Sequence, residues 1–147
     1  MRRETRGDRK AQTAAGDACR AAWGWAGGEY ANKWSPIDYY FTDGIPLVCV
    51  GEFKRRNNPH RQYKTVFLSV RKYEALERAR VAAGVDARYV VGYDDGIWWV
   101  DSFNVDASNP QILGRTDRAN APNDQEPVIE VPVASMTFLT KIDWPIA

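Results

Sequence analysis

SPIDYYFTDGIPLVCVGEFKRR, residues 35–56, is the stretch that decides the fold. Apolar and aromatic residues dominate the segments on both sides of Asp43-Gly44-Ile45-Pro46, a run rich in turn-forming residues. This pattern predicts two strands, Ile37–Thr42 and Leu47–Lys54, joined as a hairpin. Each strand carries a charged motif at its end away from the turn.

These motifs are Pro36-Ile37-Asp38, which opens the first strand, and Glu52-Phe53-Lys54, which closes the second. Either motif alone is weak, because Pro-x-Asp recurs at Pro122–Asp124 and acid-x-Lys recurs at Asp8–Lys10. Those two copies lie in polar segments with no strand around them. The signal is therefore the order of the first two motifs on consecutive strands, not either motif by itself.

The length of the turn decides whether Asp38 and Glu52 meet. With a two-residue loop, Asp43-Gly44, Asp38 falls opposite Cys49 and no site forms. With a three-residue loop, Gly44-Ile45-Pro46, Asp38 lies directly opposite Glu52, and the two Cβ atoms are about 5 Å apart. The proline has no N–H for a strand ladder, so it favours the three-residue loop.

Two carboxylates this close repel each other unless a cation lies between them. Mg²⁺ or Mn²⁺ prefers hard oxygen ligands, which Asp38, Glu52, the Phe53 carbonyl group and water can supply. Lys54 projects from the same face of its strand as Glu52, about 6.6 Å further along, where it can assist an attacking water. Asp38, Glu52 and Lys54 are therefore the predicted catalytic residues of a metal-dependent phosphodiesterase.

Composition excludes several other functions. The chain has one histidine, His60, so no site that needs two imidazoles can form, and we expect this residue on an exposed loop. Two cysteines, Cys19 and Cys49, and no signal peptide favour buried thiols in a cytoplasmic protein. Neither an apolar run long enough for a membrane helix nor a glycine-rich nucleotide-binding motif occurs.

The charge is balanced overall but not along the chain. Residues 1–80 hold 16 Lys and Arg against 9 Asp and Glu, whereas residues 81–147 hold 4 against 10. We expect residues 1–9 to form a flexible basic arm and residues 10–147 to form a single domain. The basic front half favours an anionic partner, and the acidic back half leaves open a protein-interaction module.

Helical spacing of apolar residues predicts one helix over Lys10–Trp23 and a second that Ser69 caps and Gly84 ends. Further strands are expected at Glu29–Trp34, Tyr63–Leu68, Arg88–Tyr93, Ile97–Asp101 and Val128–Val133. Ser102–Pro127 is expected as a long loop that contains Arg115 and Arg118. The fold class is therefore α/β (α+β), with a central mixed sheet flanked by helices.

The order helix, Pro-x-Asp strand, Glu-x-Lys strand and helix resembles the PD-(D/E)xK nuclease superfamily, which includes type II restriction enzymes and archaeal Holliday-junction resolvases. Residues 35–56, FLSVRKYEAL (67–76) and GRTDRANAPNDQEPVIEVPV (114–133) resemble small single-domain members from phages and prophages. The resemblance implies a restriction-endonuclease-like core, in roughly the order αβββαβ with further C-terminal strands.

The resemblance also implies site residues. Asp38 and Glu52 would bind Mg²⁺ or Mn²⁺, and cleavage would leave a 3′-hydroxyl and a 5′-phosphate. Family members often carry a Glu on the first helix as a further ligand, and Gln12 stands at that place, where it can coordinate only as a neutral oxygen or through water. Lys72 resembles a recurrent lysine of these small proteins and is assigned a phosphate contact.

The predicted partner is DNA. Four basic residues after the Glu-x-Lys motif lie where the phosphates of the cut strand would pass: Arg55, Arg56, Arg61 and Lys64. A catalytically inactive DNA-binding protein of the same fold stays open as an alternative, because Gln12 replaces an acid. Cleavage of a duplex or junction would favour a homodimer, although no residue pattern requires one.

Overall fold

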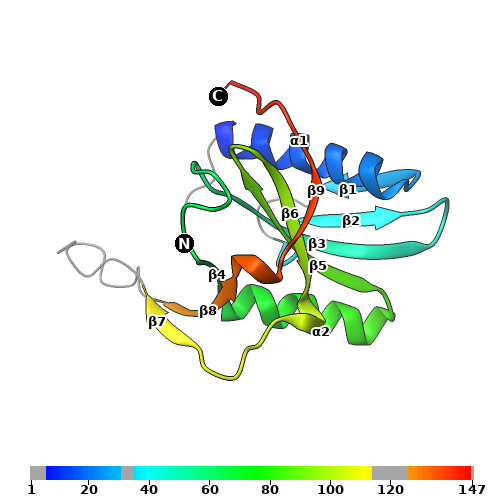
Figure 1. Cartoon of the computed structure of the whole chain (residues 1–147). Helices are drawn as coiled ribbons and strands as arrows, with labels where there is room; N and C mark the ends of the chain where they lie inside the picture. The colour runs from blue at the N-terminus through cyan, green and yellow to red at the C-terminus, as the bar shows by residue number, and fades with distance from the viewer. Residues whose placement is uncertain (1–5, 31–34, 114–125, 147) are drawn as a thin grey trace.

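Two helices cover opposite faces of a six-stranded mixed sheet in the computed structural model, which describes residues 6–30, 35–113 and 126–146 (Figure 1). In spatial order the strands of this sheet are β1 (Gly27–Tyr30), β2 (Tyr39–Thr42), β3 (Leu47–Arg55), β5 (Asp86–Tyr93), β6 (Gly96–Asp101) and β9 (Thr137–Thr140). β3 and β5 are parallel, and the other neighbours are antiparallel. The expected α/β class with a central mixed sheet is confirmed.

Helix α1 (Arg6–Trp23) begins four residues earlier than the expected Lys10, so residues 6–9, which were expected in the arm, are helical. Helix α2 (Val70–Ala83) has the predicted ends. The Ser69 hydroxyl accepts a hydrogen bond from the Lys72 N–H, and Gly84 ends the helix with a φ of 64°. No helix in these described residues is long and apolar enough to cross a membrane.

A second, three-stranded sheet of β4 (Thr65–Ser69), β8 (Glu126–Pro132) and β7 (Gln111–Leu113) lies beside α2 (Figure 1). The expected strand Val128–Val133 therefore begins two residues earlier and pairs with β4. The expected loop Ser102–Pro127 contains a 3-10 helix, Ser102–Asn104, and β7, whereas Arg115 and Arg118 lie outside the described residues. β9 and a second 3-10 helix, Val133–Ser135, were not predicted.

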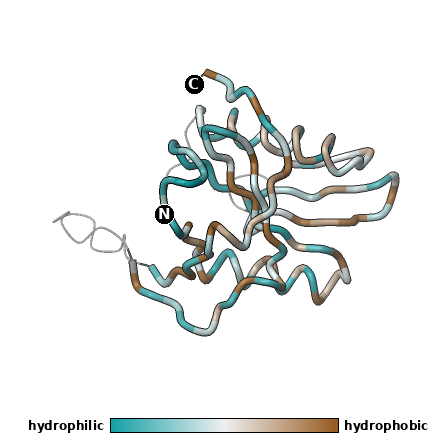
Figure 2. Tube along the Cα trace, viewed as in Figure 1, coloured by the Kyte–Doolittle hydropathy of each residue, from teal (hydrophilic) through white to brown (hydrophobic). Residues whose placement is uncertain are grey.

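The faces of the large sheet have separate cores. The α2 face buries chiefly Val50, Tyr89, Val91, Tyr93 and Leu76, and the α1 face buries chiefly Cys19, Tyr39, Phe41, Cys49 and Val90. Hydrophobic residues follow these strands, while the loop after β3 is hydrophilic (Figure 2). Both cysteines are free and buried as predicted, and burial raises the pKa of each thiol to about 12. On β3, Cys49 and Phe53 therefore face α1, whereas Val50 faces α2.

The hairpin has the register that a site requires, but the turn differs from the expected one. Tyr39 pairs with Gly51, and Phe41 pairs with Cys49. Extended by one residue, this register places Asp38 opposite Glu52. The loop has four residues, Asp43–Pro46, since Thr42 pairs with Leu47 and the Asp43 N–H donates to the Pro46 carbonyl group. A β-bulge next to this pair compensates for the extra loop residue. The predicted three-residue loop was therefore wrong, but the predicted strand register beyond the bulge was right.

Candidate metal centre

Asp38 is fixed beside the end of β3 by two hydrogen bonds. Its backbone N–H donates to the Gly51 carbonyl group at 3.2 Å, and its Oδ2 accepts from the Phe53 N–H at 2.8 Å. Because these contacts join side chain and main chain across the hairpin, the carboxyl group has little freedom to turn away. A cation ligand is better placed on such a fixed group than on a mobile one.

Glu52 lies beside Asp38 and is almost fully buried, with 7% of its surface exposed. Its Oε2 has no hydrogen-bond partner within the part of the chain that the structure describes. Burial raises the pKa of Glu52 well above its ordinary value, and the neighbouring Asp38 carboxylate raises it further. A buried carboxylate oxygen without a partner, next to a second carboxylate, is a place where a cation is favourable.

Lys72 offsets part of this negative charge. Its Nζ lies 3.2 Å from Glu52 Oε1, and it lowers the pKa of that carboxyl group without cancelling the effects of burial and Asp38. Sequence reasoning assigned Lys72 a phosphate contact and missed this ion pair. No local signal was available for it, because the Ser69 cap shows where α2 begins but not which strand its first turn approaches.

Lys54 and Phe53 follow Glu52 on β3 and point to opposite faces. Lys54 shares the α2 face with Glu52, and the Phe53 ring packs on the α1 face near Tyr39 and Trp144. The Phe53 carbonyl group points to the same side of the strand as its N–H, which Asp38 holds. The structure thus brings three predicted metal ligands and the predicted assisting lysine to one end of the sheet.

Gln12 lies near this end but on the other face. The Tyr39 hydroxyl donates a hydrogen bond to the Gln12 backbone carbonyl group, which places this part of α1 next to the start of β2. The interaction uses the main chain of Gln12, so it gives its side-chain amide no assigned role. A direct contact between Gln12 and the two carboxylates stays a prediction.

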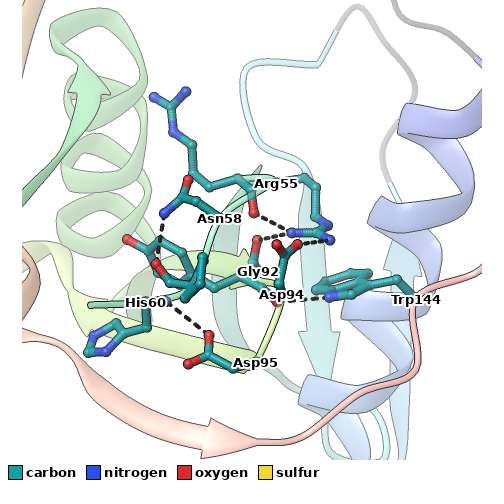
Figure 3. A network of polar contacts seen from close by, with 10 residues as sticks. Arg55, Asn58, His60, Gly92, Asp94, Asp95 and Trp144 are labelled. Atoms are coloured by element: carbon teal, nitrogen blue, oxygen red, sulfur yellow. Dashed lines mark hydrogen bonds and ion pairs between the residues drawn. The ribbon is translucent and has the colours of Figure 1, made fainter. Parts of the chain in front are cut away.

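The basic residues at the end of β3 and in the loop after it have different environments. Arg55 donates to the Gly92 carbonyl group at 3.1 Å and to Asp94 at 2.8 Å, and its guanidinium lies over the Trp144 ring at 4.4 Å (Figure 3). Its donors are therefore directed to protein acceptors. Arg56 is half-buried, whereas Arg61 and Lys64 are exposed. Of the predicted phosphate contacts on this segment, the last two have side chains open to solvent.

His60 is not the exposed loop residue that the sequence suggested. Its ring stacks on Trp98 with centroids 4.0 Å apart and meets Tyr93 edge-on at 5.3 Å. Burial lowers the pKa of His60, although a backbone hydrogen bond with Val133 acts in the opposite direction. The expectation was wrong because Trp98 is distant in sequence and becomes a neighbour only in the folded sheet.

The residues present fit a hard divalent cation. Asp38, Glu52 Oε2 and the Phe53 carbonyl group supply oxygen ligands, which Mg²⁺ or Mn²⁺ prefers. Within residues 6–30, 35–113 and 126–146, no three His, Cys, Asp or Glu side chains gather into one group. The protein would therefore contribute few ligands, as is usual for Mg²⁺, which keeps several waters.

Comparisons with known proteins agree with this fold. A family model described as "Phage putative PDDEXK endonuclease" matches residues 1–139. The chain is similar in structure to Hjc of Archaeoglobus fulgidus, a Holliday junction resolvase, with a TM-score of 0.55 over 89% of this chain and 87% of Hjc. The two sequences are 15% identical, so this likeness supports the restriction-endonuclease-like fold alone. No curated protein matches the chain.

Proposed function

Because the chain belongs to this family of phage PDDEXK endonucleases, we propose that it hydrolyses DNA phosphodiester bonds with a divalent ion held by Asp38 and Glu52. The family and the fold indicate a nuclease. The identity of the metal, the residues that bind it and the DNA substrate are the parts that we add.

The observation that carries this proposal is the unpartnered Glu52 Oε2 beside the Asp38 carboxyl group. A purely structural pair would have both carboxylates hydrogen-bonded, because an unmatched buried charge is costly. Lys72 matches only one of the two negative charges. A divalent ion would remove the rest of the conflict, and Mg²⁺ or Mn²⁺ suits the oxygen ligands.

Each residue then has a separate role. Asp38 and Glu52 hold the ion, which when bound makes a water molecule more acidic and polarises the phosphate. Lys54 projects from the same face as Glu52 and stabilises the negative charge that develops on the phosphate in the transition state. Lys72 lowers the pKa of Glu52 in part and orients its carboxyl group in the absence of substrate.

The DNA strand is proposed to leave the metal centre along the basic segment after β3. Arg61 and Lys64 are exposed there and can bind phosphates, while Arg55 supports the loop from behind. Attack by water on the phosphorus atom would break the bond to the 3′ oxygen. The products would then be a 3′-hydroxyl and a 5′-phosphate.

The test compares cleavage of linear, single-stranded and branched DNA by the wild type, Asp38→Asn and Lys54→Ala. The amide side chain introduced by Asp38→Asn keeps an oxygen that can accept from the Phe53 N–H, so this variant should remain folded. We expect cleavage by wild type with Mg²⁺ or Mn²⁺, none with EDTA, and a loss of at least about 100-fold in either variant.

Asp43→Asn, in the exposed turn at the far end of the same hairpin, is the matched control and should cleave like the wild type. DNA binding without cleavage in either metal would instead favour the inactive DNA-binding alternative. Equal cleavage by Asp38→Asn and the wild type would rule out the proposed metal site.

A further inference from the structure

A second polar site lies on the same face of the sheet, beyond Lys54. It is a small pocket between the end of β3, the loop that leads to β4 and the end of β5. We call it the His60 pocket, and its polar lining comes chiefly from Arg56, Asn58, His60, Tyr63 and Tyr93. None of these residues has a role in the metal centre.

Two buried polar atoms line this pocket without a partner. The Tyr93 hydroxyl group belongs to a side chain that is 2% exposed, and neither it nor His60 Nε2 has a hydrogen-bond partner among the described residues. The His60 ring makes a hydrogen bond with the backbone of Val133, and Nε2 is the ring nitrogen that is buried without a partner. Buried polar groups are rarely unsatisfied in folded proteins, so both atoms indicate a ligand.

Arg56 gives the pocket a positive charge. Its charge acts on the phenols of both Tyr89 and Tyr93 and favours their ionised forms, which places the guanidinium near the pocket wall. Arg56 also follows Lys54 by two residues, about 6.6 Å along the chain. This step is comparable with the separation of neighbouring phosphates along an extended DNA strand.

The pocket is built by main-chain contacts rather than by loose side chains. The Arg56 N–H donates to the Gly92 carbonyl group at 2.9 Å, and the Asp94 N–H donates to the Asn58 carbonyl group at 3.1 Å. The His60 N–H donates to Asp95 at 2.9 Å (Figure 3). The turn between β5 and β6 therefore holds the loop in place, so the pocket exists before a ligand arrives.

We propose that the His60 pocket binds a phosphate group of the DNA, next to the phosphate that is cut. Arg56 and the Tyr93 hydroxyl donate to the phosphate oxygens. If the phosphate is a monoester at a strand end, His60 Nε2 accepts its proton. If it is an internal phosphodiester, which has no such proton, Nε2 is protonated from solvent and donates to a phosphate oxygen. This inference rests on the proposed nuclease function for its ligand, but its test does not require cleavage.

The test uses Tyr93→Phe and His60→Gln, with Tyr73→Phe on α2 as the matched control. Tyr93→Phe removes only the unpartnered oxygen, so it should unfold at the same temperature as the wild type or higher. We expect it to weaken binding of a fluorescent DNA strand in EDTA by about 10-fold, because it removes a hydrogen bond to a charged group. His60→Gln should weaken binding in the same direction, and Tyr73→Phe should bind like the wild type.

His60 is the only histidine of the chain, so its ring nitrogens give one assignable set of NMR signals. Three otherwise identical strands identify the phosphate: one with hydroxyl ends, one with phosphorylated ends and one with methylphosphonate linkages. A shift of the Nε2 signal with every strand that has charged linkages identifies an internal phosphodiester. A shift with the phosphorylated ends alone identifies a strand terminus.

The inference would be overturned if fluorescence anisotropy shows that the DNA is bound but the Nε2 signal does not move. The pocket would then hold water only. A Tyr93→Phe variant that binds as tightly as the wild type would also overturn the inference. If the wild type shifts this signal but cuts no DNA with either metal, the nuclease proposal fails and the phosphate site stands.

Discussion

Each face of the large sheet carries two carboxylates next to a cation, yet the two groups differ in their access to water. On the α1 face, Arg88 pairs with Asp86 at 3.3 Å and approaches Asp101 to 3.5 Å. On the α2 face, Lys72 pairs with Glu52 at 3.2 Å, and Asp38 lies beside it. Both groups contain an ion pair and a second carboxylate, so these features alone cannot distinguish a structural group from a functional one.

Burial distinguishes them. The side chains of Asp86 and Asp101 are 63% and 35% exposed, so water stabilises the excess negative charge around Arg88. The Glu52 side chain is 9% exposed and its Oε2 has no partner among the residues described. An ion from outside the chain would therefore stabilise the second group more than the first, which is why we propose catalysis for the α2 face and a structural role for the α1 face.

The first way to test this comparison is Arg88→Ala. The guanidinium lies over the rings of Trp23, Trp25 and Trp99 at 4.5–5.3 Å, so truncation removes packing as well as two ion pairs. We expect the free energy of unfolding in urea to fall by about 3 kcal/mol. Arg78→Ala, at an exposed position of α2, should change it by less than about 0.5 kcal/mol.

Arg88→Lys adds a sharper comparison. It keeps the positive charge but loses the flat group that stacks on the indoles, so its stability should lie between those of the wild type and Arg88→Ala. DNA affinity should stay unchanged in both variants. A large loss of affinity in a variant that is still folded would contradict the division between the two faces.

The second test is Glu52→Gln, whose effect on stability should have the opposite sign. In EDTA the substitution replaces a buried carboxyl group whose ionisation beside Asp38 is unfavourable, and we expect the free energy of unfolding at neutral pH to rise by about 1–2 kcal/mol. Added Mg²⁺ should stabilise the wild type but not Glu52→Gln, because only the wild type retains both carboxylates. Thermal unfolding with and without Mg²⁺ measures both effects.

The pH dependence of stability tests whether ionisation of Glu52 causes the difference between the wild type and Glu52→Gln. The pKa of Glu52 is raised in the folded protein, so the folded state binds this proton more tightly than the unfolded state. In EDTA its contribution to stability is fully present below the ordinary value of 4.5 and is lost as the pH rises through the folded-state pKa. The advantage of Glu52→Gln should therefore grow as the pH rises from 4.5, and parallel curves would contradict this account.

The local part of the site could be predicted from the sequence. Asp38 and Glu52 were placed opposite each other because two apolar segments flank a turn and Pro46 favours the register that pairs them, and Ser69 and Gly84 were recognised as caps. Both kinds of signal act over a few residues. The turn was wrong in detail, since a bulge that depends on the pairing of the whole hairpin restores the register.

The distant contacts could not be predicted in this way. The ion pair of Lys72 with Glu52 and the stacking of His60 on Trp98 join segments far apart in the sequence. β9 pairs with β6, from which β7 and β8 of the other sheet separate it in sequence, so this four-residue strand had no local signal. Single-sequence patterns carry no information on which of many such pairings is made.

The smallest expected effects concern two arginines, one at the end of β3 and one in the loop after it. Arg55→Gln removes the hydrogen bonds to Gly92 and Asp94 and should lower the free energy of unfolding by about 1 kcal/mol, with little change in DNA affinity. Arg61→Gln, at an exposed position, should leave stability unchanged and reduce the salt dependence of DNA binding by about one counterion. Binding isotherms at several salt concentrations, with urea unfolding of the same proteins, measure both. The two arginines are only six residues apart. We expect Arg61 alone to contact DNA, because Arg55 already has hydrogen-bond partners in the protein. An equal loss of DNA affinity in both variants would contradict this explanation.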